Sequence, residues 1–355
     1  MADPSATETA SGWACPIPLG RSDEVTLGHG GGGRLTAELV AEVFLPALGN
    51  DTLAAMADAA TVDVAGTRLA MSTDAFVVRP LFFPGGDIGS LAVHGTVNDL
   101  ACSGAIPLYI TATFVIEEGM PVADLRRIAS SMGTAAREAG VSVVAGDTKV
   151  VDRGRGDGVY ITTAGVGLGR PRVTVGPDLA RAGDVVLVSG PIGQHGVAVM
   201  SVREGLEFGS PVASDSAPIH GLVAALIDAG IGVHVLRDPT RGGVAAVLNE
   251  VAVASSVGIS ITESAVPIAA PVRSACALLG IDPMQVANEG RLVAVVAAGD
   301  ADRALDALRA CEGGTGAVAI GIVVPDHPGV VVGRTAIGGR RIIDMPLGEL
   351  LPRIC

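Results

Sequence analysis

Three aspartates, Asp74, Asp87 and Asp99, lie in a part of the chain that is otherwise apolar or small. The pattern predicts short strands before and after Asp74, and a helix over residues 88–103 that Asp87 caps. Carboxylates in an apolar stretch are costly to bury unless a cation or hydrogen bonds compensate them, so they indicate ligands of a hard metal ion. Solvated caps and turns are the alternative interpretation, and the pattern alone does not separate the two.

A fourth aspartate, Asp147, precedes the only lysine of the chain, Lys149. An apolar strand over residues 141–145 is predicted to run into a loop that carries both side chains. The other 23 of the 24 basic residues are arginines. The use of lysine at this one position indicates a chemical role for its compact ammonium group. Such a group approaches a phosphate as a point charge where a guanidinium fork does not fit. Codon bias is the competing explanation.

Residues 28–33 read Gly-His-Gly-Gly-Gly-Gly and formally match the dinucleotide pattern GxGxxG. No convincing strand precedes them and no βαβ unit follows, so the match is weak. We expect instead a flexible loop whose amides, around Gly30 and Gly31, close over phosphates. The sequence contains no Walker A motif.

Composition narrows the class of protein. The 355 residues are 49% hydrophobic and 3% aromatic, as expected for α/β domains with aliphatic cores. The net charge of -13 argues against a nucleic-acid partner, because a basic surface is needed to replace the counterions of the phosphates. We find neither an apolar run of membrane-spanning length nor a secretory signal, so the expected location is cytoplasmic.

Five cysteines lie far apart without a CxxC pair, which argues against a zinc ribbon or a disulfide framework. One of them, Cys102, is expected to be a small core residue of its helix. Another, Cys355, ends the chain behind a Gly-Gly hinge, so its thiol is expected to be mobile and able to enter another site. A frayed end that happens to finish in cysteine is the alternative.

Strands and helices alternate in both halves of the chain, which predicts two mixed α/β domains. The expected boundaries are a disordered segment over residues 1–22, an N-terminal domain over 23–170, a C-terminal domain over 171–335, and a flexible tail over 336–355.

Several long strings identify a family. STDAFVVRPLFFPGGDIGSLAVHGTVNDLACSGA, AGDTKVV, DPTRGG, NEGR and the terminal PRIC together closely resemble the hydrogenase expression/formation protein HypE, from about residue 25 to Cys355. Relatives of that family include aminoimidazole ribonucleotide synthetase, selenophosphate synthetase and thiamine-monophosphate kinase. The resemblance implies an ATP-binding fold of two α/β domains that usually forms a homodimer, with ATP bound by the N-terminal domain.

The resemblance also implies a reaction on the protein's own tail. In this family the carbamoyltransferase HypF places a carbamoyl group on the terminal cysteine, and ATP is used to dehydrate it to a thiocyanate. The cyanide then passes through the HypC-HypD complex to the iron of a nickel-iron hydrogenase precursor. The chemistry is consistent, because phosphorylation makes the amide oxygen a good leaving group and loss of the nitrogen's protons leaves a nitrile.

By motif match, the resemblance implies that carboxylates hold magnesium and the ATP phosphates, and that Lys149 steadies the transferring phosphoryl group. Three of the carboxylates are the expected metal ligands: Asp74, Asp99 and Asp147. The remaining expected ATP contacts are Asp87, Asn98, Gly30 and Gly31.

Glu289, in the Asn-Glu-Gly-Arg turn, is the expected general base on the carbamoyl nitrogen, and a structural pair with Arg291 is the alternative. His94 is a candidate for proton transfer, or else packs against its helix. Asp238 and Arg241 are expected to shape the passage for the tail, although helix capping explains Asp238 equally well.

Two rival functions remain. The first is an ATP-dependent kinase or synthetase of a free small molecule, with selenophosphate synthetase as the nearest example. The glycine loop lacks the Cys or Lys that this family commonly carries there. The second is a non-catalytic scaffold that presents Cys355 to maturation partners, which leaves the aspartates around Lys149 unexplained.

Overall fold

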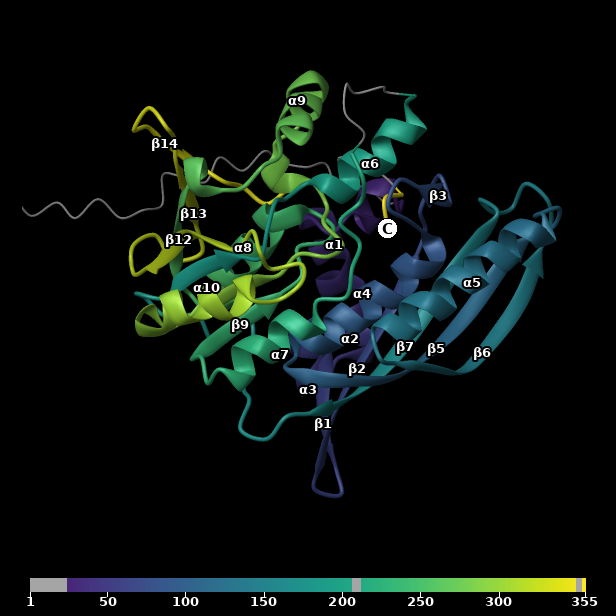
Figure 1. Ribbon diagram of the computed structural model, residues 1–355, viewed down its shortest axis with the longest axis horizontal. Helices are drawn as coiled ribbons and strands as arrows, with labels where there is room; N and C mark the ends of the chain where they lie inside the picture. Colours follow the sequence, from purple (N-terminus) through teal and green to yellow (C-terminus); the bar gives the residue numbers. More distant parts are fainter. Residues whose placement is uncertain (1–23, 206–211, 349–352) are drawn as a thin grey trace, which may run out of the picture.

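The computed structural model describes residues 24–205, 212–348 and 353–355. The prediction of disorder for residues 1–22 lies outside these ranges. Two mixed sheets with helices packed against them form the molecule, which confirms the predicted fold class (Figure 1). In the described part of the chain, no helix combines the length and the apolar character required to cross a membrane.

The first sheet has five strands in the order β1-β2-β7-β5-β6, and every pair is antiparallel except β5 with β6. One face carries two helices, and β6 forms an edge (Figure 1). The bounds are β1 Ala60–Val64, β2 Thr67–Phe76, β5 Ala105–Glu117, β6 Ser142–Val151, β7 Val159–Gly169, α4 Ile88–Cys102 and α5 Val122–Glu138.

The α4 helix is the central element of the fold. It begins after Asp87, whose Oδ1 accepts hydrogen bonds from the backbone N–H groups of Gly89 (2.8 Å) and Ser90 (3.1 Å), so the predicted helix and its cap are confirmed. Nearly all of its residues are buried, because it packs against the first sheet and α5 on one side and against α7 and β9 on the other. A helix that is buried on nearly all sides therefore joins the two domains.

Two loops predicted around aspartates are strand interior. Asp74 lies within β2, paired with Thr163, so the two predicted short strands are one. Asp147 and Lys149 lie within β6 rather than in a loop after it. Aspartate is rare in strands, but cross-strand hydrogen bonds outweigh that local preference here.

The second sheet has seven strands in the order β14-β13-β10-β12-β8-β11-β9, with β10 and β13 as its only parallel pair. Apolar side chains of α8 pack on one face, and those of α7 and α10 pack on the other. The bounds are β8 Val185–Val188, β9 Val233–Arg237, β10 Gly258–Thr262, β11 Val293–Val296, β12 Val318–Val324, β13 Val331–Arg334, β14 Arg340–Ile342, α7 His220–Asp228, α8 Gly243–Ala254 and α10 Ala301–Arg309.

Shorter elements complete the chain. The segment from the glycine loop to β1 contains η1 Leu27–Gly30, α1 Arg34–Leu39, a π-helical turn η2 Val40–Phe44, α2 Leu45–Leu48 and α3 Asp51–Ala54. Elsewhere are β3 Phe82–Phe83, β4 Gly86–Asp87, α6 Gln194–Arg203, α9 Ala270–Leu279 and the 3-10 turns η3 Glu263–Ala265, η4 Pro283–Gln285 and η5 Ala298–Asp300.

The described parts of the expected flexible tail are packed. β14 pairs with β13, and the carbonyls of Pro346 and Leu347 accept hydrogen bonds from the N–H groups of Arg34 and Leu35 (3.0 Å each). The last three residues return to the first domain, where the C-terminus lies beside β3 and α6 (Figure 1).

Candidate active site

A cavity of about 40 Å³ lies where the two domains and the end of the chain meet. Side chains from β2, α4, the loop after β9, the turn before β11 and the C-terminus line it. The chemically active ones are Asp74, Asp99, Asp238, Arg241, Glu289 and Cys355. The structure thus brings together six of the residues that the sequence singled out.

Asp74 and Asp99 approach each other from β2 and α4. Their carboxyl groups are hydrogen bonded, and the Ser72 hydroxyl donates to Asp99 Oδ2 at 2.6 Å. Desolvation raises the pKa of Asp74, and desolvation together with neighbouring carboxylates holds the pKa of Asp99 well above its ordinary value. Gly95 permits this approach, since a Cβ there would lie 2.8 Å from the Phe76 ring.

Asp238 directly follows β9 and is 6% exposed. Its Oδ2 has no hydrogen-bond partner within the described residues. Desolvation first, and then the charges of Asp58 and Asp74, hold the pKa of Asp238 well above its ordinary value. An orphaned carboxylate oxygen among other acids is a typical ligand of a divalent cation.

Asp58 is a member of this acidic cluster that the sequence interpretation missed. Oxygen atoms of Asp58 and Asp238 and the Cys102 sulfur all lie within 4.8 Å of one another. Desolvation raises the pKa of Asp58 to about 6, although Arg237 pairs with it at 2.9 Å. The available signal was an aspartate among small and apolar residues, just before the start of β1.

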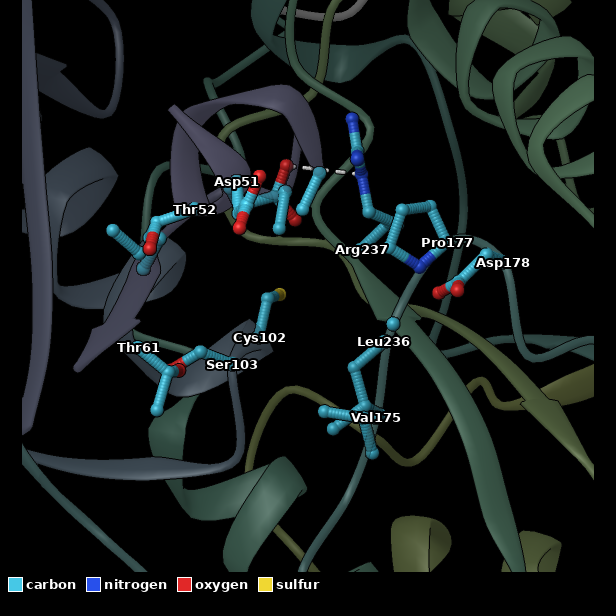
Figure 2. A pocket seen from close by; sticks show the side chains of 16 residues that line it. Asp51, Thr52, Thr61, Cys102, Ser103, Val175, Pro177, Asp178, Leu236 and Arg237 are labelled. Carbon is cyan, nitrogen blue, oxygen red and sulfur yellow. Dashed lines mark ion pairs between the residues drawn. The ribbon is translucent and has the colours of Figure 1, made fainter. Parts of the chain in front are cut away.

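A second cavity of about 330 Å³ adjoins Asp58 (Figure 2). Cys102 lies in the middle of the view, between Thr52 on one side and Pro177 on the other, and the dashed line is the Asp58–Arg237 ion pair. Cys102 is buried as expected, but it faces carboxylates as well as apolar neighbours, and desolvation holds its thiol pKa well above the ordinary value.

The donor set of the cluster fits divalent cations. Asp58, Asp74, Asp99 and Asp238 concentrate more negative charge than Arg237 and Arg241 neutralise, and the pKa of each of the four carboxyl groups is raised. Several hard oxygen ligands in one place suit Mg²⁺, which in turn binds phosphate oxygens.

Glu289 is held from its backbone. Its N–H donates to Asp215 Oδ1 (3.3 Å), and its carbonyl accepts from the N–H of Ala217 (3.2 Å). Gly290 is required next to it, because a Cβ there would lie 1.9 Å from the Asp215 carbonyl oxygen. The expected alternative, a pair with Arg291, is wrong: Arg291 instead pairs with Asp215 at 3.3 Å.

The Glu289 side chain is 1% exposed and is hydrogen bonded to the Cys355 thiol. Its Oε1 has no partner in the described part of the chain. Desolvation, followed by the charges of Asp238 and Asp215, holds the pKa of Glu289 well above its ordinary value. A carboxyl group of this kind is a candidate acid or base for a group attached to the sulfur.

His195 is a further residue that the sequence interpretation missed. It lies on α6, and its Nε2 is 2.8 Å from the carbonyl oxygen of Ile354 while its Nδ1 is 2.8 Å from Ser214 Oγ. Desolvation lowers its pKa to about 4, so the ring is neutral at pH 7 and Nε2–H donates to the tail. No local motif marks this residue, since its partner lies 159 positions away.

Asp87 and Asn98 do not line the cavity, contrary to expectation. Asp87 caps α4. The fully buried Asn98 amide donates to the carbonyls of Ala217 (3.1 Å) and Glu289 (3.4 Å) and accepts from the N–H of Ile219 (2.8 Å). Because its side chain is committed to these bonds, Asn98 positions Glu289 rather than a nucleotide.

His94 packs within the domain interface. Its Nδ1 lies 2.9 Å from Ser216 Oγ, and it does not line the cavity that contains Cys355. Desolvation lowers its pKa to about 4, with a smaller effect of His220. The packing alternative is therefore favoured over proton transfer.

Asp147 does not share a site with Asp74 in one chain. Asp74 pairs with Thr163, whose hydroxyl donates to α4, so Asp74 faces the helices. Asp147 pairs with Thr113, which pairs with Thr162, the neighbour of Thr163. Since side chains alternate along a strand, Asp147 points from the opposite face. Within one chain, therefore, Asp147 does not join Asp74 and Asp99 at one metal site.

Lys149 shares that helix-free face, two residues further along β6. It pairs with Asp147 at 2.7 Å, and the two side chains are 67% and 58% exposed. Within one chain, then, both residues lie on the surface and away from the acidic cluster.

The glycine loop is attached to the cavity wall. Arg241 donates to the Gly30 carbonyl at 2.8 Å. Gly32 adopts a φ of +71°, and a Cβ there would lie 2.6 Å from Arg241 Cβ, so only glycine permits this contact. Gly31 is buried beside it.

Comparisons with known proteins agree with this geometry. Residues 56–169 match the family model of the AIR synthase related protein, N-terminal domain, and residues 181–333 match that of the C-terminal domain. These matches and the two sheets define a two-domain protein of the AIR synthase related class.

More closely, the chain is 54% identical to carbamoyl dehydratase HypE of Rhizobium leguminosarum bv. viciae, over 93% of this chain and 95% of the relative. It is 44% identical to the Escherichia coli K12 protein of the same name, over 94% and 100%. The chain therefore belongs to the carbamoyl dehydratase HypE family.

Solved structures agree. The HypE-HypF complex matches with a TM-score of 0.83 and 49% identity over 87% of this chain and 99% of that one. HypE in complex with ATP matches with a TM-score of 0.79 and 46% identity over 94% and 100%. A thiamine-monophosphate kinase at 19% identity shares the fold (TM-score 0.62).

Proposed function

We propose that this protein dehydrates an S-carbamoyl group on its own Cys355 to a thiocyanate, with hydrolysis of ATP, during maturation of nickel-iron hydrogenase. The observation that carries the proposal is the position of the Cys355 thiol, which is hydrogen bonded to Glu289 in the same cavity as Asp74, Asp99 and Asp238. A free small-molecule substrate leaves this arrangement of the tail unexplained.

The acidic cluster is the proposed site for magnesium and the ATP phosphates. Asp58, Asp74, Asp99 and Asp238 would hold the metal, which would supply charge neutralisation for phosphoryl transfer to the carbamoyl oxygen. Support comes from the raised pKa values and the orphaned Asp238 Oδ2, and from a relative solved in complex with ATP.

Glu289 is the proposed proton acceptor for the carbamoyl nitrogen. A carbamoyl group on Cys355 Sγ extends from the atom that already contacts the Glu289 carboxyl group. Phosphorylation converts the carbamoyl oxygen into a leaving group, and the C–O bond then breaks to release phosphate. The two N–H protons leave through Glu289, one to the departing phosphate and one to solvent, which leaves the nitrile. The net products are the thiocyanate, ADP and phosphate.

A homodimer is the proposed assembly, because it gives Lys149 a role. The helix-free face of the first sheet, which also carries Asp147 and Lys149, exposes apolar side chains that include Met71 (51%) and Tyr109 (50%). A second copy packed on this face covers these groups and receives the ammonium near its own nucleotide, which one chain alone does not achieve.

Partners follow from the same reaction. A relative is solved as a HypE-HypF complex, which supports HypF as the source of the carbamoyl group. The proposed acceptor of the cyanide is the HypC-HypD complex, and the proposed location of this exchange is the cytoplasm.

The test is the mass of the C-terminal peptide after carbamoylation of Cys355 and addition of magnesium and ATP. We expect loss of one water at Cys355 that requires ATP and is absent without carbamoylation. Retention of the carbamoyl group while ATP is consumed on an added small molecule would support a free-substrate kinase or synthetase instead. No ATP consumption with a carbamoylated tail would support the scaffold.

A further inference from the structure

We propose that the active site recognises the C-terminal tripeptide Arg353-Ile354-Cys355 as a peptide ligand in its own right. It therefore accepts, as a separate substrate, a peptide that ends in these residues and carries an S-carbamoyl group. This inference rests on the dehydration of Cys355 proposed above and extends it from the protein's own tail to a class of substrates.

Main-chain N–H groups of the folded body bind the backbone of the tripeptide. The N–H of Val77 donates to a Cys355 carboxylate oxygen (3.2 Å), and the N–H of Arg79 donates to the Arg353 carbonyl (3.1 Å). Both donors lie immediately after β2 ends, and the bound segment is not a regular strand, because Arg353 adopts a φ of +57°. Such hydrogen bonds give affinity through the main chain of the peptide.

Two side chains of the body complete the recognition. His195 donates to the Ile354 carbonyl (2.8 Å), and Arg203 Nη2 donates to the Arg353 carbonyl (2.6 Å). All three terminal residues therefore have a backbone oxygen bound by the folded body. None of these contacts depends on the side chains of the tail.

Ile354 supplies the selectivity. Its side chain is 2% exposed and belongs to the apolar cluster that includes Phe83, Val197 and Val212. The His195 ring stands edge-on to Phe83, with centroids 5.4 Å apart, so one wall of this pocket also holds the donor to the tail. A penultimate residue that is charged or much smaller cannot fill the pocket.

Arg353 adds a weaker preference. Its guanidinium pairs with Asp157 at 2.7 Å, and that carboxylate also pairs with Arg79 at 3.3 Å. The Arg353 side chain is 37% exposed, so the pair is partly screened by water. We therefore expect Cys355 and Ile354 to contribute most to recognition of the peptide, and Arg353 to contribute less.

The recognised groups all belong to the three terminal residues, so a free peptide presents the same groups. What a free peptide lacks is the high effective concentration that a covalent connection provides, on the order of millimolar for short linkers. The expected difference between the two substrates is therefore in the concentration needed for saturation. The chemistry is unchanged: carbamoyl peptide and ATP give peptide thiocyanate, ADP and phosphate.

The test uses the full-length variant Ile354→Asp/Cys355→Ser, whose own tail neither fills the pocket nor reacts. Carbamoylated Pro-Arg-Ile-Cys is added with magnesium and ATP, and conversion to the thiocyanate is followed by mass. The matched control peptide is carbamoylated Pro-Arg-Asp-Cys. We expect conversion of the first peptide and at least a tenfold lower rate for the second.

A second measurement covers the case in which the variant does not fold. Unmodified Pro-Arg-Ile-Cys is added to the wild-type protein during dehydration of its own carbamoylated Cys355, and we expect inhibition that Pro-Arg-Asp-Cys does not cause. If the wild-type protein dehydrates its own Cys355, but the peptide is neither converted nor inhibitory, this inference is wrong and the proposed function still stands. Absence of dehydration in the wild-type protein instead contradicts the function on which it rests.

Discussion

The Cys355 thiol and the Glu289 carboxyl group are hydrogen bonded in a cavity that both domains close. Burial favours the neutral acid at Glu289 in the metal-free protein, because desolvation and neighbouring carboxylates raise its pKa. Cations held by those carboxylates would oppose this effect and favour the basic form. The pairing thus connects the reactive end of the chain to the proposed nucleotide site.

Glu289→Gln tests the proposed base, since glutamine retains the size of the side chain but accepts no proton. We expect the rate of dehydration at Cys355 to fall by about 10²–10⁴-fold, the usual contribution of general base catalysis. Carbamoylation of Cys355 by HypF is expected to be unchanged, and the mass of the C-terminal peptide over time measures both steps. A variant that dehydrates at the wild-type rate assigns the proton transfer elsewhere.

His195→Gln tests the neutral imidazole that binds the tail. Burial lowers the pKa of His195 to about 4 from an ordinary value of 6.5, so its contribution to stability is fully present above pH 6.5 and is lost as the pH falls through 4. Relative to the variant, the wild-type protein is expected to lose about 3 kcal/mol of unfolding free energy between pH 7 and pH 4. Denaturant unfolding across this range measures the difference.

The same experiment has a clear opposite outcome. The chemical shift of the His195 ring, measured against pH, gives its pKa in the wild-type protein. A pKa near the ordinary value would show that the imidazole is solvated and does not hold Ile354. Equal pH dependence of the two proteins would lead to the same conclusion.

Asp238→Asn tests the metal site through stability rather than activity. Because burial raises the pKa of Asp238, the carboxylate costs stability as the pH rises, and asparagine removes that cost. We expect the metal-free variant to melt a few degrees higher than the wild-type protein at pH 7, and the melting temperature to lose its response to magnesium with ATP.

Asp306→Asn, at an exposed position of α10, is the matched control and is expected to preserve the response to magnesium. A magnesium-dependent shift that persists in Asp238→Asn would place the cation at other carboxylates.

Tyr109→Asp tests the proposed dimer face. A charge at this half-exposed position of the first sheet is expected to convert the dimer to a monomer by light scattering and to abolish ATP turnover. Ile322→Asp, at an equally exposed position of the second sheet, is the control and is expected to remain dimeric. Lys149→Ala is expected to remain dimeric as well, with loss of turnover.

A monomeric wild-type protein that turns over ATP would contradict this proposal. So would a Tyr109→Asp monomer with normal turnover, because Lys149 points away from the acidic cluster of its own chain.

The sequence by itself determined features that depend on neighbours along the chain. The extent of α4 and its Asp87 cap follow from apolar spacing and a polar residue at the boundary, both of which are local. The two mixed α/β domains were also predicted from the sequence, because the alternation of strands and helices along the chain is a local pattern too. Asp74, Asp99, Asp238 and Glu289 stood out because their types are unusual in apolar surroundings.

Only the tertiary structure decided which of these side chains meet. Register across β2, β7, β5 and β6 places Asp147 and Lys149 on the face opposite Asp74, and no local pattern encodes register between distant strands. Asp58 and His195 join the site through contacts across the domain interface, and Asn98 is committed to backbone groups more than a hundred residues away. Such contacts arise from the packing of the whole chain, because desolvation and hydrogen bonding act on neighbours in space.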